Sequence, residues 1–420
     1  MSELNGKYRF LPFVMWYTVL LFFFYQFIAR SSFPTVLTEQ FMEYFRIDAA
    51  GMGVLASCYY WAYTLMQVPS GMIIDKVSVK TIATVATAIS ACGILLFVST
   101  PNYYTAGFGQ MLFGFGSSFA FILTLKIITI WFPASEVPVK TSYTMAIGGL
   151  GPFIGGPTVS YLVTKISWIS LIKIFAIFGL FLSLIMWLVI RDKERLPVNK
   201  EEKKVSLMDS LGMILTSKQV WVLALFTTML YAPLSALGDL WGVSFIRKAY
   251  NVDSTMAALA NNMLYIGMVI GSPTFAYMAV FWNSYKKPMT LGISMAAICF
   301  GAVVFLPQLP IQAIFCLFFF TGFSCGAMLS YPLAMMIFPY SVGATVSGFI
   351  NMASMVSGII LMPLIGYIIN LSWDGTIENG IRVYSVNDYR LGLISVFVFL
   401  VIGIFLSLIV EDRSPRQQRK

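Results

Sequence analysis

The 420 residues are 58% hydrophobic and only 11% charged, and their mean hydropathy is +0.81. Soluble domains carry about 25% charged residues, so this composition excludes an ordinary soluble enzyme, a disordered chain and a secreted disulfide scaffold. The chain has no histidine, and its five cysteines lie in apolar segments without CxxC spacing, so we expect no metal ion or other cofactor. The net charge of +9 does not indicate nucleic-acid binding, because the basic residues follow a membrane-orientation pattern.

Twelve stretches are apolar enough to cross a bilayer, which takes about 20 residues. In chain order they cover residues 10–37, 49–74, 81–98, 104–131, 141–163, 168–190, 220–246, 255–281, 289–306, 311–337, 342–369 and 391–410. The first stretch runs into Glu39 and Glu43 without a small-residue cleavage site, so we predict a span and not a signal peptide.

The basic residues predict the orientation of these spans. An even number of spans places both termini on one side of the membrane. With the termini inside, the inner loops and tails hold 18 basic residues, whereas the outer loops and their edges hold 7. By the positive-inside rule, both termini are cytoplasmic, and we expect a bacterial inner (plasma) membrane.

The longest polar interruption, residues 191–218, divides the chain into two sets of six spans. We therefore predict a first six-helix bundle at 1–190, a cytoplasmic linker at 191–218 and a second six-helix bundle at 219–420. The linker has charges of both signs, which favours a solvated connector over a lipid head-group site. The fold class is thus an all-α polytopic membrane protein, built by the internal duplication that transporters use for alternating access.

The loop after the second span reads Gly71-Met-Ile-Ile-Asp75-Lys76-Val-Ser-Val-Lys80. It resembles the GxxxD[RK]xxx[RK] loop of the major facilitator superfamily, and the twelve-span pattern is similar to that family over nearly the whole chain. The resemblance implies a transporter with two pseudo-symmetric six-helix bundles. In this loop Gly71 would let two helices approach closely, Asp75 would cap a helix or pair with a base, and Lys76 and Lys80 would hold the loop on the inner face. Together they would latch one conformational state. The second half lacks the acid at the equivalent place, so the latch would be one-sided.

Two further resemblances bear on function. Residues 151–157 of the fifth span resemble the GPxxGG segment of the family's drug/proton antiporters, although a packing kink explains the same residues. Residues 25–37, 59–71 and 349–358 are similar in style to the phagosomal amino-acid transporters of intracellular gammaproteobacteria.

Three ionisable side chains fall inside spans: Arg30, Lys126 and Asp239. A charge at mid-bilayer costs about 2.5–3.5 kcal/mol on insertion scales, so each should face a cavity, a partner or a boundary. At 1.5 Å per residue, Arg30 and Asp239 lie about 10 and 9 Å into the outer halves of the first and seventh spans. These spans are related by the internal repeat. We therefore predict that Arg30 and Asp239 face each other across the interface between the bundles.

This opposite-charge pair has two compatible interpretations. It could close the outer side of the cavity as a salt bridge, or it could bind the two ends of a zwitterion. A structural alternative is that Arg30 snorkels outward while Asp239 caps a short segment near Gly238 and Gly242. Lys126, about 12 Å toward the cytoplasm, could bind an anion, close the inner side or snorkel.

Helical spacing adds polar neighbours to this pair as candidate solute-binding residues: Gln26, Tyr59, Tyr63, Tyr231, Tyr265 and Asn351. Tyrosines and amides in such positions also serve as helix–helix contacts. Asp239 is the acid deepest within a span and hence the candidate proton site, but the fourth span lacks the acid often found in the family's organic-anion symporters. A facilitator without proton coupling therefore stays open.

One cation and one anion suit a zwitterion, so we predict a secondary active or facilitative transporter for an amino acid or short peptide. The alternative is a drug or organic-ion efflux antiporter of the same superfamily. No GxSxG motif, phosphate loop or cluster of acids is present, so we do not expect an enzyme. The expected partners are a small solute and membrane lipid, with no nucleic acid, and the protein is expected to be a monomer.

Overall fold

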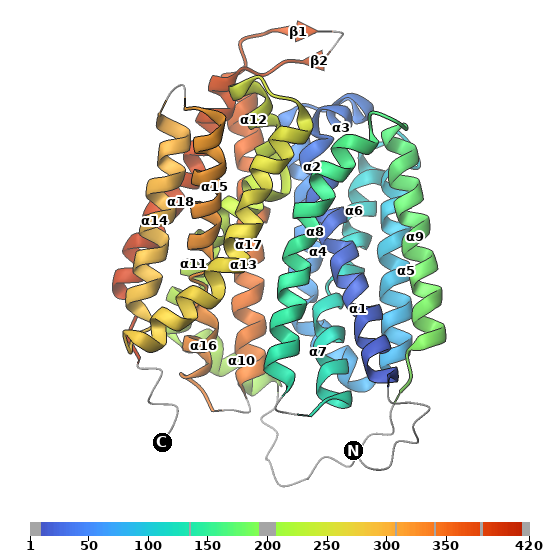
Figure 1. The fold of residues 1–420 in the computed structure, drawn as a ribbon, viewed down its shortest axis with the longest axis vertical. Coiled ribbons are helices and arrows are strands. Elements are labelled where there is room, and N and C mark those ends of the chain that lie inside the picture. The colour runs from blue at the N-terminus through green and yellow to red at the C-terminus, as the bar shows by residue number, and fades with distance from the viewer. Residues whose placement is uncertain are drawn as a thin grey trace.

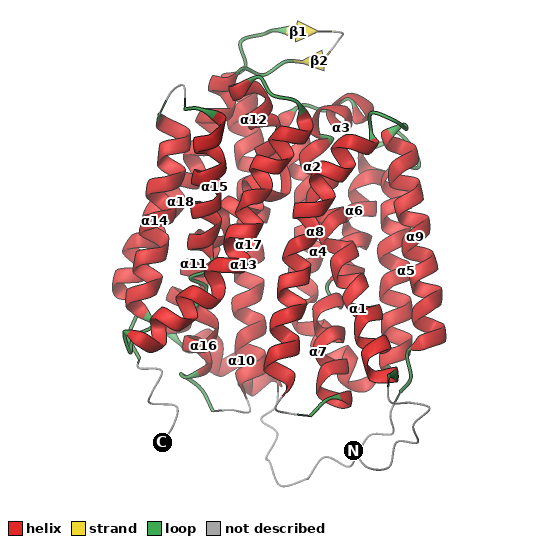
Figure 2. Ribbon diagram, in the orientation of Figure 1, coloured by secondary structure: helices red, strands yellow, loops and turns green. Residues whose placement is uncertain are grey.

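The computed structural model describes residues 10–133, 136–192, 207–306, 309–339, 342–378 and 381–413, without the side chains at positions 68, 75, 138, 207, 344 and 381. Almost all of the described chain is helical (Figure 2). The predicted all-α membrane fold is confirmed.

The first half of the chain contains the elements that trace the first six predicted spans. They are α1 (Leu11–Phe27), η2 (Ile28–Ser32), α2 (Phe33–Val36), α3 (Thr38–Phe45), α4 (Ala49–Lys76), α5 (Val79–Phe97), α6 (Tyr103–Ser117), α7 (Ala120–Trp131), α8 (Val137–Leu162) and α9 (Trp168–Val189).

The second half has a similar order after one additional helix, with α12 in place of α2 and α3 and two strands before its last helix. Its elements are α10 (Leu207–Thr216), α11 (Lys218–Pro233), η4 (Leu234–Trp241), α12 (Gly242–Tyr250), α13 (Ser254–Phe281), α14 (Lys286–Phe305), α15 (Ile311–Cys325), α16 (Ser330–Met335), α17 (Gly343–Ser372), β1 (Ile377–Glu378), β2 (Ile381–Arg382) and α18 (Val386–Ile409). The two strands pair antiparallel between α17 and α18.

Figure 1 shows the first half on the right and the second on the left. We call the end with β1 and β2 the hairpin end, and the end with α7, α10 and α16 the α10 end. Within the described ranges, ten helical segments are long and apolar enough to cross a membrane. Helices α4 and α8, with 28 and 26 residues, are long enough but richer in Gly, Pro, Ser, Thr and Tyr.

Two spans predicted as continuous are broken at equivalent places. The fourth is α6 and α7, which meet at Ser118–Phe119, and the tenth is α15 and α16, which meet near Gly326. A Cβ on Gly326 would overlap the backbone of α13, so this glycine permits the close approach that accompanies the break. Helix α10 lies inside the interval 191–218 that was predicted to be linker, and residues 193–206 lie outside the described residues.

The halves meet along two helix pairs, α4 with α17 and α8 with α13. Glycine permits the approach of the first pair, because a Cβ on Gly366 would overlap the carbonyl group of Ala49 at the start of α4. The segments η2 and η4 also contact each other, at the level between these pairs where the two predicted charges lie.

Candidate functional site

Arg30 and Asp239 lie in the two π-helical segments, η2 and η4. Pro34 lacks the N–H that would bond to the carbonyl of Arg30 in an α-helix, and Pro233 stands immediately before η4. A π-helical turn replaces the regular ladder at each place. Such turns occur often at functional sites, because they change the direction in which side chains project.

The two charged side chains meet across the halves. Arg30 Nη2 lies 3.6 Å from Asp239 Oδ2, and the two side chains are 3% and 0% exposed. The outward snorkelling of Arg30 that was considered above is therefore wrong, because the guanidinium is buried and faces the second half.

Asp239 is surrounded by donors. The hydroxyl groups of Tyr60 and Tyr265 both bond to its carboxyl group, the latter at 2.5 Å from Oδ1. With the ion pair to Arg30, this carboxyl group is contacted from three different elements: α4, α13 and η2.

Arg30, by contrast, has donors to spare. Nη2 lies 3.3 Å from the Tyr231 hydroxyl and Nη1 lies 4.0 Å from the Met355 sulfur, and the guanidinium stands 4.6 Å from the centroid of the Phe27 ring. Its Nε, although buried, has no hydrogen-bond partner among the described residues. The site therefore offers a buried, incompletely satisfied guanidinium, which is suited to an anion.

A layer of amides and tyrosines lies toward the α10 end. Asn351 Nδ2 donates to Gln67 Oε1 across the halves at 2.7 Å, and the Tyr331 hydroxyl donates to Asn351 Oδ1 at 3.2 Å. The buried Nε2 of Gln67 has no partner among the described residues. Gln67 is seven residues from Tyr60 on α4, so this layer lies about 10 Å along the helix from the charged pair.

Gln26, Tyr59 and Tyr63 form a connected group within the first half. The Tyr59 hydroxyl donates to Gln26 Oε1 at 3.0 Å, and the Tyr59 and Tyr63 rings stack with centroids 5.6 Å apart. Of the other candidate binding residues, Tyr231 and Tyr265 contact the charged pair, and Asn351 belongs to the layer toward the α10 end. Lys126 is half-buried on α7, and the Thr129 hydroxyl donates to its carbonyl.

The hairpin end is held by contacts between the halves. Glu39 pairs with Arg247 at 3.1 Å, and Asp48 pairs with Arg382 at 3.5 Å. The Ala49 N–H also donates to the Tyr384 hydroxyl at 3.1 Å, and burial raises the pKa of that phenol. The site is thus closed toward this end.

The loop predicted as a latch differs from the expectation. A Cβ on Gly71 would meet no atom of the described residues within 4 Å, so among them the expected close helix approach is not present. Lys76 is exposed at the end of α4, and the side chain of Asp75 lies outside the described residues. Lys80 stands over the Trp187 ring at 4.1 Å, and its N–H donates to Asp192 at 3.3 Å.

We call Asp192 and Asp412 the helix clasps, because each follows the end of one helix and bonds to the start of another, at equivalent places in the two halves. Asp192 follows the sixth span and accepts the Ser78 hydroxyl at 2.5 Å, at the start of α5. Asp412 follows the twelfth span and accepts the Ser284 hydroxyl at 2.5 Å, just before α14. Asp192 was predicted to belong to a solvated linker, but it binds the N-terminus of a transmembrane helix.

The GPxxGG segment lies in the packing between the halves. Asn262 Nδ2 on α13 donates to the Pro152 carbonyl on α8 at 2.7 Å. Gly156 lies against the same amide, which would overlap a Cβ there. The residues that resemble an antiporter motif therefore form part of the α8–α13 contact.

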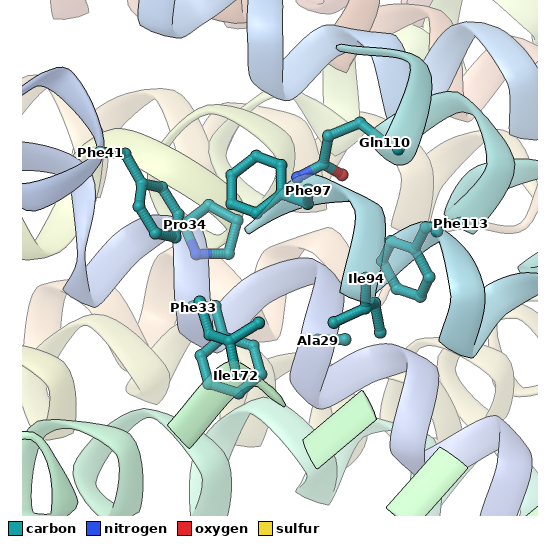
Figure 3. A pocket seen from close by; sticks show the side chains of 11 residues that line it. Ala29, Phe33, Pro34, Phe41, Ile94, Phe97, Gln110, Phe113 and Ile172 are labelled. Carbon is teal, nitrogen blue, oxygen red and sulfur yellow. The ribbon is translucent and has the colours of Figure 1, made fainter. Parts of the chain in front are cut away.

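A separate pocket lies wholly in the first half (Figure 3). Its lining is apolar apart from Gln110 and consists of Ala29, Phe33, Pro34, Phe41, Gly93, Ile94, Phe97, Gly109, Gln110, Phe113 and Ile172. Its lining residues carry no charge, so this pocket offers no anchor for an ionic solute. The described part of the chain also contains no group of three or more metal-ligating side chains.

Sequence reasoning missed Tyr60, Tyr331 and Ser31, whose hydroxyl lies 2.8 Å from the Tyr265 hydroxyl. Tyr60 lies between two predicted tyrosines, and its spacing of seven residues from Gln67 was a usable signal. Ser31 had no such signal, because ideal α-helical spacing from Arg30 does not lead to the next residue.

Comparison with known proteins agrees with this fold. The Major Facilitator Superfamily profile matches residues 19–362. The chain is 23% identical over 396 residues to the uncharacterized transporter YybO of Bacillus subtilis, covering 88% of this chain and 89% of that protein. It is 21% identical over 400 residues to the D-galactonate transporter of Escherichia coli, covering 86% and 90%. The crystal structure of a bacterial homologue of the human lysosomal transporter Spinster, inward-facing and unoccupied, superposes with a TM-score of 0.77 at 17% identity, covering 96% and 97%.

Proposed function

Because this chain belongs to the Major Facilitator Superfamily of membrane transporters, we propose that it carries a small carboxylate-bearing solute by alternating access, with Arg30 binding the carboxylate. The observation that supports this most directly is the asymmetry of the charged pair. Arg30 is buried with unused donors, whereas the carboxyl group of Asp239 already accepts from two tyrosines and pairs with Arg30. A buried cation with open donors is a site for an anion.

A sugar acid is the solute that this site suits best. Its carboxylate would bind Arg30, and its hydroxyl groups would bind the layer of Gln67, Asn351 and Tyr331 about 10 Å away along α4. The unpartnered Nε2 of Gln67 supplies a donor for a hydroxyl oxygen. The name of the D-galactonate transporter among the relatives supports the same class.

A zwitterionic amino acid or short peptide is the second candidate, and the closeness of the two opposite charges favours it. Its ammonium group would have to displace Tyr60 or Tyr265 from Asp239. The resemblance to phagosomal amino-acid transporters belongs with this candidate.

Solute binding would be coupled to opening of the hairpin end. A carboxylate on Arg30 replaces Asp239 as its counter-ion and so removes a cross-half ion pair. We assign residues 1–190 and 219–420 to the two moving bundles, with 191–218 linking them. We place the protein in the inner membrane as a monomer, with the hairpin end outside and the termini in the cytoplasm. We assign proton coupling to Asp239. We assign to the loop 71–80 the role of a latch that stabilises the state open at the α10 end. We assign to Lys126 an auxiliary contact with an anion.

The test is uptake into proteoliposomes of D-galactonate and other sugar acids against a panel of amino acids and dipeptides. Replacing Arg30 with Lys, which loses the fork geometry, should weaken binding of either solute. Asp239→Asn separates the candidates: binding of a sugar acid survives this change, whereas binding of an amino acid is lost with the acceptor of its ammonium. Arg30→Lys with unchanged binding of every transported solute would refute the site.

A further inference from the structure

Thr64 on α4 differs from the other buried threonines of this protein. The described chain has ten buried threonines, and nine of them donate the side-chain hydroxyl to the carbonyl four residues earlier, as Thr87 does to Ala83. Thr64 is 7% exposed, and its hydroxyl has no hydrogen-bond partner among the described residues. A threonine in a helix has that carbonyl within reach, so this hydroxyl is free for another partner.

Helix packing does not explain a threonine at this position. A buried hydroxyl without a hydrogen bond destabilises the protein, and a valine has nearly the same shape without that cost. The buried serines of α17, Ser354 and Ser357, bond within α17 and to η4 instead of to Thr64. The unused hydroxyl is therefore better explained by a ligand than by the contact between the two helices.

Thr64 lies between the charged pair and the amide layer. On α4 it follows Tyr60 by four residues and precedes Gln67 by three, so the three side chains share one face of the helix. Along the helix axis it is about 6 Å from Tyr60 and about 4.5 Å from Gln67. Tyr60 bonds to Asp239 and Gln67 bonds to Asn351, so both neighbours meet the second half within the candidate site. Because Gln67 Nε2 is also unpartnered, two unused polar groups are neighbours on this face.

We propose that Thr64 is a specificity-determining residue, whose hydroxyl bonds to a hydroxyl group in the middle of the solute. This inference rests on the proposed function, in which Arg30 binds the carboxylate and the far end of the solute reaches Gln67. A threonine hydroxyl can donate and accept, so it can bond to a solute hydroxyl in either direction. A sugar acid has hydroxyl groups on successive carbons, and one such chain can therefore satisfy both Thr64 and Gln67.

The same arrangement selects against acids that lack hydroxyl groups. A plain alkanoate would leave the Thr64 hydroxyl and Gln67 Nε2 buried without partners. A site that is built to bond to a hydroxyl group discriminates strongly against an analogue without one. Arg30 thus binds the charge of the solute, whereas Thr64 distinguishes hydroxylated from apolar chains.

The test compares the equilibrium binding of D-galactonate and of hexanoate, a six-carbon acid without hydroxyl groups, to the purified full-length protein. Wild type should prefer D-galactonate. Thr64→Val should lower the ratio of the two affinities by about two- to tenfold, the contribution of one hydrogen bond, and the loss should come from D-galactonate alone. An unchanged ratio overturns the proposal, whether neither affinity changes or both fall equally.

Thermal unfolding without solute gives a second readout. Thr64→Val should raise the unfolding midpoint by about 1–3 °C, because it removes a buried hydroxyl that has no partner. The matched control is Thr321→Val on α15, which removes a buried hydroxyl that donates to the Leu317 carbonyl. This control should not raise the midpoint and should bind D-galactonate as wild type does. A lower midpoint in Thr64→Val, or an equal rise in both variants, contradicts the inference.

Arg30→Lys distinguishes a failure of this inference from a failure of the proposed function. If Arg30→Lys weakens the binding of both acids while Thr64→Val leaves their ratio unchanged, the carboxylate site stands and only the role of Thr64 is lost. If wild type does not bind D-galactonate, the proposed solute fails and this inference fails with it.

Discussion

Replacing Asp239 should lower the free energy of unfolding more than replacing Arg30 does. In the unloaded protein, Asp239→Asn leaves a guanidinium that cannot lose its proton in a site where the pair is 3% and 0% exposed. Breaking a buried pair in this way costs about 3–5 kcal/mol. The remaining contacts to the Tyr231 hydroxyl and the Phe27 ring offset part of it, so we expect a loss of about 3 kcal/mol.

Arg30→Met should be milder, because the carboxyl group of Asp239 keeps its bonds to Tyr60 and Tyr265. We expect a loss of about 1 kcal/mol in the free energy of unfolding. The double variant should resemble Arg30→Met, because it contains no unpaired charge.

The assay is thermal unfolding in detergent at one pH, with the order of the midpoints as the result. The expected order is wild type, then Arg30→Met together with the double variant, then Asp239→Asn. A carboxylate solute should raise the midpoint of Asp239→Asn more than that of Arg30→Met, since it binds the orphaned guanidinium. Equal losses in the two single variants, or additive losses in the double variant, would refute the reasoning.

Three further results follow from the packing. Gly366→Ala places a Cβ against the Ala49 carbonyl and should destabilise the closed state of the hairpin end by about 1–3 kcal/mol. A cysteine introduced at the buried position Thr38 should then be labelled faster. Gly348→Ala on the same helix is the control, because a Cβ there has open space and the variant should behave as wild type. Asp192→Ala and Asp412→Ala should each lower the unfolding midpoint by a similar amount, equivalent to about 1–2 kcal/mol of lost helix capping, with exposed Glu411→Ala as the unaffected control. Arg247→Ala and Arg382→Ala should each cost no more than about 1 kcal/mol, and less in high salt, because these ion pairs are about one-third exposed; a larger, salt-independent loss would contradict their assignment as rim contacts.

The spans could be predicted from sequence because a bilayer imposes one strong requirement, about 20 apolar residues with an internally bonded backbone. The meeting of Arg30 and Asp239 could also be anticipated, since the internal repeat relates their two helices. Their immediate neighbours could not. Ideal helical spacing places Gln26 beside Arg30, but Gln26 bonds Tyr59 instead. The π-helical turn brings the adjacent Ser31 into the site, and hydropathy carries no information about that turn.

The clasps at Asp192 and Asp412 illustrate a second limit. Each acid lies in a charged segment at the end of a span, where composition predicts a solvated connector. Its true partner is a serine more than a hundred residues earlier. Only the pairing of the third and sixth spans within each half brings acid and serine together, and this pairing depends on how the helices pack, not on the composition of either segment.

The strength of the contacts that close the hairpin end is unevenly distributed, and this distribution bears on mechanism. The rim pairs Glu39–Arg247 and Asp48–Arg382 are partly solvated, so each contributes little. The contacts between η2 and η4 are fully buried, so their loss is costly and must be compensated when the halves separate. A carboxylate that binds Arg30, as proposed, acts directly on those contacts. The proposed solute site and the main closing contact are the same group of residues, so coupling between binding and opening would require no transmission through the rest of the protein.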